Sequence, residues 1–159
     1  MTDILSAQER SANMARIHGS NTQPELMVRR SLHAAGYRFR LHASHLPGRP
    51  DIILPSRRTV ILVHGCFWHR HPGGNFAYRP KSRLHFWENK FSATTARDQF
   101  QISTLISLGW KVIVVWECTL RGKLRRSATL KVLCNSLASS SATYQEFPVQ
   151  LIAESETGR

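Results

Sequence analysis

Residues 46–71 contain the side chains of this chain whose types and spacing best suit catalysis. Asp51 follows a proline and opens an apolar run, where a carboxylate is costly to bury unless it is paired or holds a metal ion. A second apolar run ends at His64, and His69 and His71 follow, so that three histidines fall within eight residues. A neutral imidazole can take a proton from water near pH 7. The pattern therefore suits metal-assisted hydrolysis of a phosphate diester, with a turn aspartate and solvated histidines as the alternative interpretation.

Length, charge and cysteine content narrow the class of protein. The 159 residues suffice for one domain with its own core, and 22 Lys and Arg against 10 Asp and Glu give a net charge of +12. That excess favours a polyanionic partner, although no amphipathic apolar stripe supports a membrane surface. No apolar run reaches the roughly 20 residues that span a bilayer, and the N-terminus lacks the apolar core of a signal peptide. Three cysteines without a secretory signal favour reduced thiols or metal thiolates over disulfides.

The first element that must position these side chains is a helix over residues 22–35. Thr22 and Glu25 form a capping box, with a proline in the first turn. The capping box by itself explains Glu25, yet Glu25 also falls on the apolar face with Val28 and Leu32. We therefore expect its side chain to point inward. Residues 1–20 are polar and basic without strong periodicity, and they are predicted to be an arm.

The rest of the chain alternates between strand and helix patterns. Residues 51–54 and 59–63 are short apolar runs around a turn, which predicts a hairpin of buried strands. The order of elements predicts an α/β domain over residues 21–140, with a mixed sheet flanked by helices, and a tail at 141–159 with at most partial order. The other predicted elements are an exposed-face strand at 37–42, a loop at 64–81, a helix with room for one break at 82–108, a buried strand at 111–116 and a basic helix at 125–137.

Four segments, LPGRPD, VHGCFWHRH, FWENKF and GWKVIVVWEC, together resemble the very-short-patch-repair (Vsr-type) DNA mismatch endonucleases over roughly residues 7–122. The resemblance implies a restriction-endonuclease-like α/β fold in which histidine chemistry replaces the usual Glu-x-Lys pair. It also implies a Mg²⁺-dependent enzyme that nicks one strand of duplex DNA beside a thymine mispaired with guanine. Such T:G mismatches arise from deamination of 5-methylcytosine.

The resemblance implies catalytic roles position by position. Asp51 would be the magnesium ligand, with the backbone carbonyl of Val63 as a second protein contact. His69 would be the general base that activates the attacking water, and His64 would help position that water or the scissile phosphate. Glu25 matches a family position that supports the catalytic histidine.

DNA contacts are implied in the same way. Two consecutive large rings in an extended loop cannot both face one core, so at least one of them is predicted to be exposed, against the alternative that all are core residues. The resemblance implies that aromatic rings enter the DNA from the major-groove side, that a methionine enters from the minor-groove side, and that two side chains of the 82–108 helix lie near the DNA backbone. These residues are, in that order, Phe67, Trp68 and Trp87, then Met14, then Lys90 and Asp98.

Cys66, His71 and Cys118 resemble part of a structural zinc site, for which Cys and His are suitable ligands. The family pattern has a further cysteine shortly after His71, where this chain has Gly73-Gly74-Asn75, so the ligand set is incomplete. The alternative is that no zinc binds and that both cysteines are buried thiols. Cys134 is predicted to be an ordinary apolar position of the 125–137 helix.

The expected partner is double-stranded DNA with a T:G mismatch, and the family resemblance adds mismatch-repair proteins. We expect a monomer in the bacterial cytoplasm, associated with the nucleoid when bound to DNA. Two alternatives stay open: a restriction-type endonuclease that acts on a fully paired site, and a catalytically inactive DNA-binding relative. The sequence does not give the bases that flank the mismatch or the basic residues that contact phosphates.

Overall fold

The computed structural model describes residues 6–16, 19–72 and 77–148 of the chain. Its centre is a five-stranded sheet in which the strands follow chain order from one edge to the other. The first three strands are antiparallel, and the last two run parallel to the third. The strands are β1 (Arg40–Leu41), β2 (Ile52–Leu54), β3 (Thr59–His64), β4 (Lys111–Trp116) and β5 (Tyr144–Phe147).

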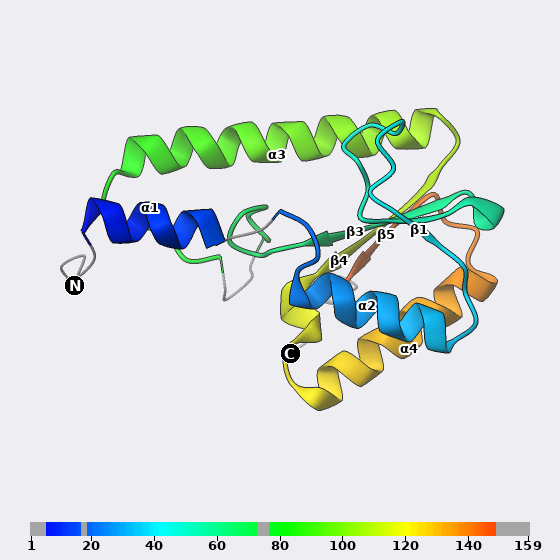
Figure 1. Ribbon diagram of the computed structural model, residues 1–159. Helices are drawn as coiled ribbons and strands as arrows, with labels where there is room; N and C mark the ends of the chain where they lie inside the picture. The colour runs from blue at the N-terminus through cyan, green and yellow to red at the C-terminus, as the bar shows by residue number, and fades with distance from the viewer. Residues whose placement is uncertain (1–5, 17–18, 73–76, 149–159) are drawn as a thin grey trace, which may run out of the picture.

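Helices cover both faces of the sheet (Figure 1). Helices α2 (Gln23–Ala34) and α4 (Lys123–Ser139) pack on one face, and α3 (Leu84–Ser107) packs on the other. The first half of α3 extends beyond the sheet, and α1 (Ala7–Arg16) lies on that same side of the molecule (Figure 1). Among the described helices, none is both long enough and apolar enough to cross a bilayer.

Two apolar layers hold the sheet, because side chains alternate between its faces. Val60 and Leu62 of β3 pack in the layer that contains Leu105 of α3. Ile61 points to the other face and packs in the layer that contains Leu32 of α2 and residues of α4. Strand β3 is therefore buried on both sides, which explains its continuous apolar run. The end of this strand is a rigid place from which to present a side chain.

Most of the predicted elements are confirmed, including the α/β class with a mixed sheet. The hairpin forms from β2 and β3, and Thr22 accepts a hydrogen bond from the Glu25 backbone at the start of α2. The predicted strand at 37–42 is wrong in length, since only Arg40–Leu41 pair with β2. Helix α3 has no break over its 24 residues.

The two ends of the described chain contain elements that sequence periodicity did not indicate. Residues 7–16, within the predicted arm, form α1, whose described side chains are all exposed. Residues 144–147, within the predicted tail, form β5 at the edge of the sheet beside β4. Phe147 is the buried residue of β5 and packs into the layer with α2 and α4. The folded unit therefore continues at least to this residue.

Truncation of Phe147 tests whether β5 belongs to the core. Phe147→Ala is expected to lower the free energy of unfolding by about 3–5 kcal/mol, because it removes a buried ring. The control is Val132→Ala on α4, since Val132 is 47% exposed, and a change within about 0.5 kcal/mol is expected there. Urea denaturation measures both variants. A loss for Phe147→Ala no larger than that of the control would contradict the assignment.

Candidate active site

A cleft of about 750 Å³ opens where the end of β3, the start of α2 and the middle of α3 meet. The loop that follows β3 and the short helix η2 (Glu117–Leu120) complete its wall. All four residues predicted to be catalytic line it: Glu25, Asp51, His64 and His69. Side chains distant in sequence are thus brought to one place.

Asp51 is held by the backbone of the neighbouring strand. Its Oδ2 accepts a hydrogen bond from the Val63 N–H at 2.8 Å. Burial raises the pKa of Asp51 to about 6, and the hydrogen bond from Val63 opposes that shift. The N–H and C=O of one residue in an extended strand point to the same side, so the Val63 carbonyl also faces Asp51. A carboxylate and a carbonyl at one point are ligands that suit a hard cation.

His64 and His69 form a stacked pair, with ring centroids 3.9 Å apart and planes 3° from parallel. Burial first, and the nearby His69 second, lower the pKa of His64 to about 3. His64 is therefore neutral near pH 7. Two charged rings at this separation would repel each other, which further disfavours a charge on His64.

Asp98 of α3 lies against His69, with 2.6 Å between its Oδ2 and His69 Nδ1. When Nδ1–H donates to the carboxylate, Nε2 keeps its lone pair and can accept a proton. The carboxylate would also stabilise an imidazolium. The contact would therefore allow His69 to act as a general base, with Asp98 as the carboxylate that positions its ring.

The contact of Asp98 with His69 was not predicted from the sequence. The resemblance assigned the support of the histidine to Glu25 and placed Asp98 near the DNA backbone. The contacts of Glu25 in the described chain are instead to its own helix start, to Arg29 at 2.9 Å and to His42 at 3.8 Å. The prediction that Glu25 points inward is confirmed, since it is 2% exposed and lines the cleft. Thr22 also caps the helix, and its hydroxyl and the Asn21 N–H donate to the Glu25 carboxylate.

Two further cleft residues had no signal in the sequence. His42 lies beyond the end of β1 with a left-handed backbone (φ 47°), and its Nε2 is 3.0 Å from Arg29 Nη2. Glu117 follows β4, and its Oε1 accepts a hydrogen bond from the Cys66 N–H at 3.3 Å. Each of these side chains contacts a residue that is distant in the sequence, and local periodicity does not encode such contacts.

Cys66, His71 and Cys118 come together as predicted, beneath the loop that follows β3. The His71 Nδ1 atom lies 3.7 Å from Cys66 Sγ and 3.4 Å from Cys118 Sγ. Burial raises the pKa of the Cys66 thiol to about 12, so without a cation this site holds a neutral thiol. Burial also lowers the pKa of His71. The stretch Gly73-Gly74-Asn75 lies outside the described residues.

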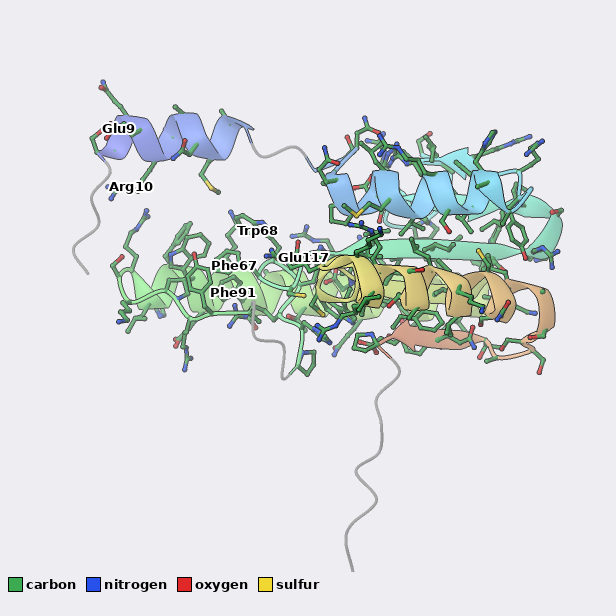
Figure 2. All side chains as sticks on the ribbon, turned by 90° about the horizontal axis from the view of Figure 1, so that it is seen from below. Glu9, Arg10, Phe67, Trp68, Phe91 and Glu117 are labelled. Carbon is green, nitrogen blue, oxygen red and sulfur yellow. The ribbon has the colours of Figure 1, made fainter. Side chains whose placement is uncertain are left out.

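The rings predicted to contact DNA form one aromatic cluster on the projecting half of α3. Figure 2 shows Phe67, Trp68 and Phe91 gathered there, with Glu117 nearer the sheet. The centroid of Phe67 lies 5.0 Å from that of Trp68, 5.6 Å from that of Trp87 and 5.2 Å from that of Phe91. The prediction that Phe67 or Trp68 is exposed is wrong, because these contacts leave both rings partly buried.

Of the other two residues predicted to contact DNA, Lys90 lies beside this cluster and Met14 lies on α1. Lys90 is exposed on α3, with its Nζ 5.4 Å from the centroid of the Trp68 ring. Met14 is 43% exposed on α1. Cys134 lies on α4, partly buried against the core as predicted.

The mixed sheet flanked by helices is consistent with a restriction-endonuclease-like fold, with His64 at the end of β3 and His69 in the loop after it. A family model described as "DNA mismatch endonuclease Vsr" matches residues 2–74. The chain is 52% identical over 120 residues to the type II nicking enzyme V.XorIIP of Xanthomonas oryzae pv. oryzae, covering 76% of this chain and 88% of that one.

Two further relatives are each 42% identical over 123 residues, or 77% of this chain. One is the type II nicking enzyme V.NmeAIP of Neisseria meningitidis serogroup A, of which 87% is covered. The other is the DNA mismatch endonuclease Vsr of Escherichia coli K12, of which 78% is covered. The chain belongs to the Vsr family of DNA endonucleases.

Replacement of Asp98 tests the role of the His69–Asp98 pair. Asp98→Asn is expected to lower kcat for cleavage of duplex DNA on the order of 10²-fold or more with little change in KM, because the amide cannot stabilise a charged ring. The matched control is Glu88→Gln, which removes an exposed carboxylate of the same helix that pairs with Arg79. Single-turnover cleavage measures both, and similar rates for the two variants would refute the pairing role.

Proposed function

We propose that this protein nicks one strand of duplex DNA at T:G mismatches that arise from deamination of 5-methylcytosine. The observation that carries the proposal is the cleft that partly buried Asp51 shares with the His69–Asp98 pair. Membership of a family of DNA endonucleases supports it. The net charge of +12 suits a polyanionic substrate.

Asp51 and the Val63 carbonyl would hold Mg²⁺. The residues fit this ion, because Asp51 is a partly buried carboxylate whose Oδ1 has no hydrogen-bond partner among the described residues. When bound, Mg²⁺ supplies Lewis-acid stabilisation of charge on the phosphate and on the leaving oxygen. Without a cation the pKa of Asp51 is raised to about 6, and a bound cation would lower it and favour the ionised form.

His69 would accept a proton from the attacking water at Nε2 while Asp98 holds Nδ1–H. Neutral His64, stacked on His69, would keep the water or the scissile phosphate in line. The bond between phosphorus and the 3′ oxygen then breaks. The products are a 5′-phosphate and a 3′-hydroxyl at the nick.

The aromatic cluster would recognise the lesion. Rings that push between base pairs must unstack them, and a mismatched step costs less to unstack than a paired one. Phe67 and Trp68, in the loop after β3, lie against Trp87 of α3, next to the exposed cation of Lys90. Met14 on α1 would contact the opposite groove.

We also propose that one copy of the chain acts alone, in the bacterial cytoplasm. A single chain supplies the carboxylate, both histidines and the aromatic cluster. Mismatch-repair proteins would then be partners of the pathway rather than parts of the site.

Cleavage of labelled duplexes tests the proposed function. With Mg²⁺, the wild-type protein is expected to nick one strand of a T:G duplex and to leave the matched duplex largely intact, and EDTA abolishes the nick. Asp51→Ala and His69→Ala should each lower kcat on the order of 10²–10⁴-fold while DNA binding changes little. His33→Ala, at an exposed histidine of α2, is the matched control.

The same assay separates the two alternative functions. Equal cleavage of matched and mismatched duplexes would indicate a restriction-type enzyme instead. Binding without any Mg²⁺-dependent nick would indicate a catalytically inactive relative. Normal activity of either Ala variant would refute the assigned roles.

We further propose that Cys66, His71 and Cys118 hold a structural Zn²⁺. Ligand atoms bound tetrahedrally to one zinc at the usual bond lengths lie about 3.6 Å apart. The measured Sγ–Nδ1 separations of 3.7 and 3.4 Å fit that spacing. Bound zinc would hold both sulfurs as thiolates, against the raised pKa of Cys66.

Metal analysis of the purified protein tests the zinc site. We expect close to one zinc per chain, and the metal should be lost in Cys118→Ser. Cys134→Ser is the control, because this cysteine is on α4 and outside the cluster. A zinc content near zero in the wild-type protein would remove this proposal and leave the proposed nuclease chemistry unaffected.

A further inference from the structure

Arg70 lies in the loop between β3 and α3. Its side chain forms hydrogen bonds to both described parts of this loop, the outgoing half (residues 65–72) and the returning half (residues 77–83). Its backbone is left-handed (φ 54°), so the side chain turns back over the loop. Its Nη1 donates to the carbonyl of Tyr78 at 3.0 Å and, more weakly, to that of Phe67 at 3.4 Å. Its Nη2 donates to the Ala77 carbonyl at 3.1 Å. Residues on the two sides of segment 73–76 are thus joined by one side chain.

The same guanidinium also fixes the loop to α3. Its Cζ lies 4.1 Å from the centroid of the Phe91 ring, the buried aromatic of the projecting half of that helix. It lies 5.9 Å from the centroid of Phe67. A planar cation on an aromatic face is a favourable contact, and its edge remains available for hydrogen bonds to carbonyls. Arg70 therefore contacts the outgoing half of the loop, the returning half and α3.

The described residues between β3 and α3 form no helix or strand, and ordering a long loop is costly. A contact that joins the two halves of the loop would therefore stabilise it. The cluster of Cys66, His71 and Cys118 attaches only the outgoing half, to η2. On the returning half, the Tyr78 ring stacks on Phe67 with centroids 4.9 Å apart, and Arg70 holds the backbone of that tyrosine.

Contact with DNA phosphate is a weaker interpretation of Arg70. Both terminal nitrogens already donate to backbone carbonyls, and one face of the guanidinium lies on Phe91. The charge is therefore used within the protein.

We propose that Arg70 is a positioning residue that preforms the aromatic cluster as a rigid wedge for DNA. The proposal rests on the proposed function, in which Phe67 and Trp68 enter the base stack. A preformed wedge needs less ordering on binding, so the energy of contact with DNA is available to separate a mismatched step from a paired one. Loss of Arg70 should then reduce selectivity for the mismatch.

Arg83 provides a matched control for this residue. Its backbone is also left-handed (φ 53°), and its Cζ lies 4.4 Å from the centroid of the Phe86 ring on α3. No hydrogen bond joins it to the described part of the loop. Arg83→Ala therefore removes the same charge and a similar ring contact, but not the connection between the loop halves.

The experiment compares wild type, Arg70→Ala, Arg70→Lys and Arg83→Ala, each as the full chain, with two readouts. Amide hydrogen exchange follows His69 and His71, whose N–H groups donate to the carbonyls of Gly65 and Cys66. Cleavage gives the ratio of kcat/KM for T:G over matched duplex. Arg70→Ala should exchange about tenfold faster at these amides and lose about tenfold in the ratio, while Arg83→Ala keeps both near wild type.

Arg70→Lys separates charge from geometry, because an ammonium cannot contact carbonyls on both halves as a planar fork does. It should resemble Arg70→Ala, and a wild-type ratio would overturn the proposal. Arg70→Ala values that match those of Arg83→Ala would also overturn it. If Arg70→Ala does not fold, Arg70→Lys decides. Should wild type itself not discriminate, the proposed function fails, and the exchange rates still decide whether Arg70 orders the loop.

Discussion

The hydrogen bond from the Val63 N–H to Asp51 Oδ2 is the constraint on which the cleft depends. It fixes a partly buried carboxylate against the strand that ends in His64. Because β2 and β3 are paired in one register, Asp51, the Val63 carbonyl and His64 are positioned together. A slip of one residue would turn His64 to the opposite face of the sheet. The two apolar layers around β3 prevent that slip, since Ile61 and Leu62 would have to exchange faces as well.

Burial, more than neighbouring charge, raises the pKa of Asp51. Among the causes of its raised pKa, burial is the largest, and Glu25 adds a smaller contribution in the same direction. Arg29 contacts Glu25 at 2.9 Å and partly cancels it, since the guanidinium lowers the pKa of Asp51. Two other carboxylates of the cleft lie near arginines, Glu25 at 2.9 Å from Arg29 and Glu117 at 3.8 Å from Arg121. Among the described residues no ion pair joins Asp51 to a cation, so a dication would compensate its charge well.

The sequence predicted features that depend on residues close together in the chain. It did not predict contacts between residues that are far apart in the chain. The capping box at Thr22, the β2–β3 hairpin and strand β4 follow from patterns within a few residues. The pairing of His69 with Asp98 joins a loop to a helix 29 residues later, and no spacing rule connects them. His42 enters the cleft through a left-handed backbone that alternation cannot show. Strand β5 is short and half exposed, so its pairing with β4, not its own pattern, makes it a strand.

The prediction that Phe67 or Trp68 is exposed was wrong for a different physical reason. The argument that two adjacent rings cannot share one core assumed that the sheet was the only core. Helix α3 instead extends beyond the sheet and offers Trp87 and Phe91 as a second, smaller apolar surface. Phe67 and Trp68 pack on that surface, and His69 follows them directly in the chain with its ring on Asp98 of the same helix. The aromatic cluster and His69 are therefore attached to one helix through consecutive residues. A displacement of the rings along α3 would move His69 with them, so under the proposed function recognition of the substrate would be joined to the geometry of the reaction.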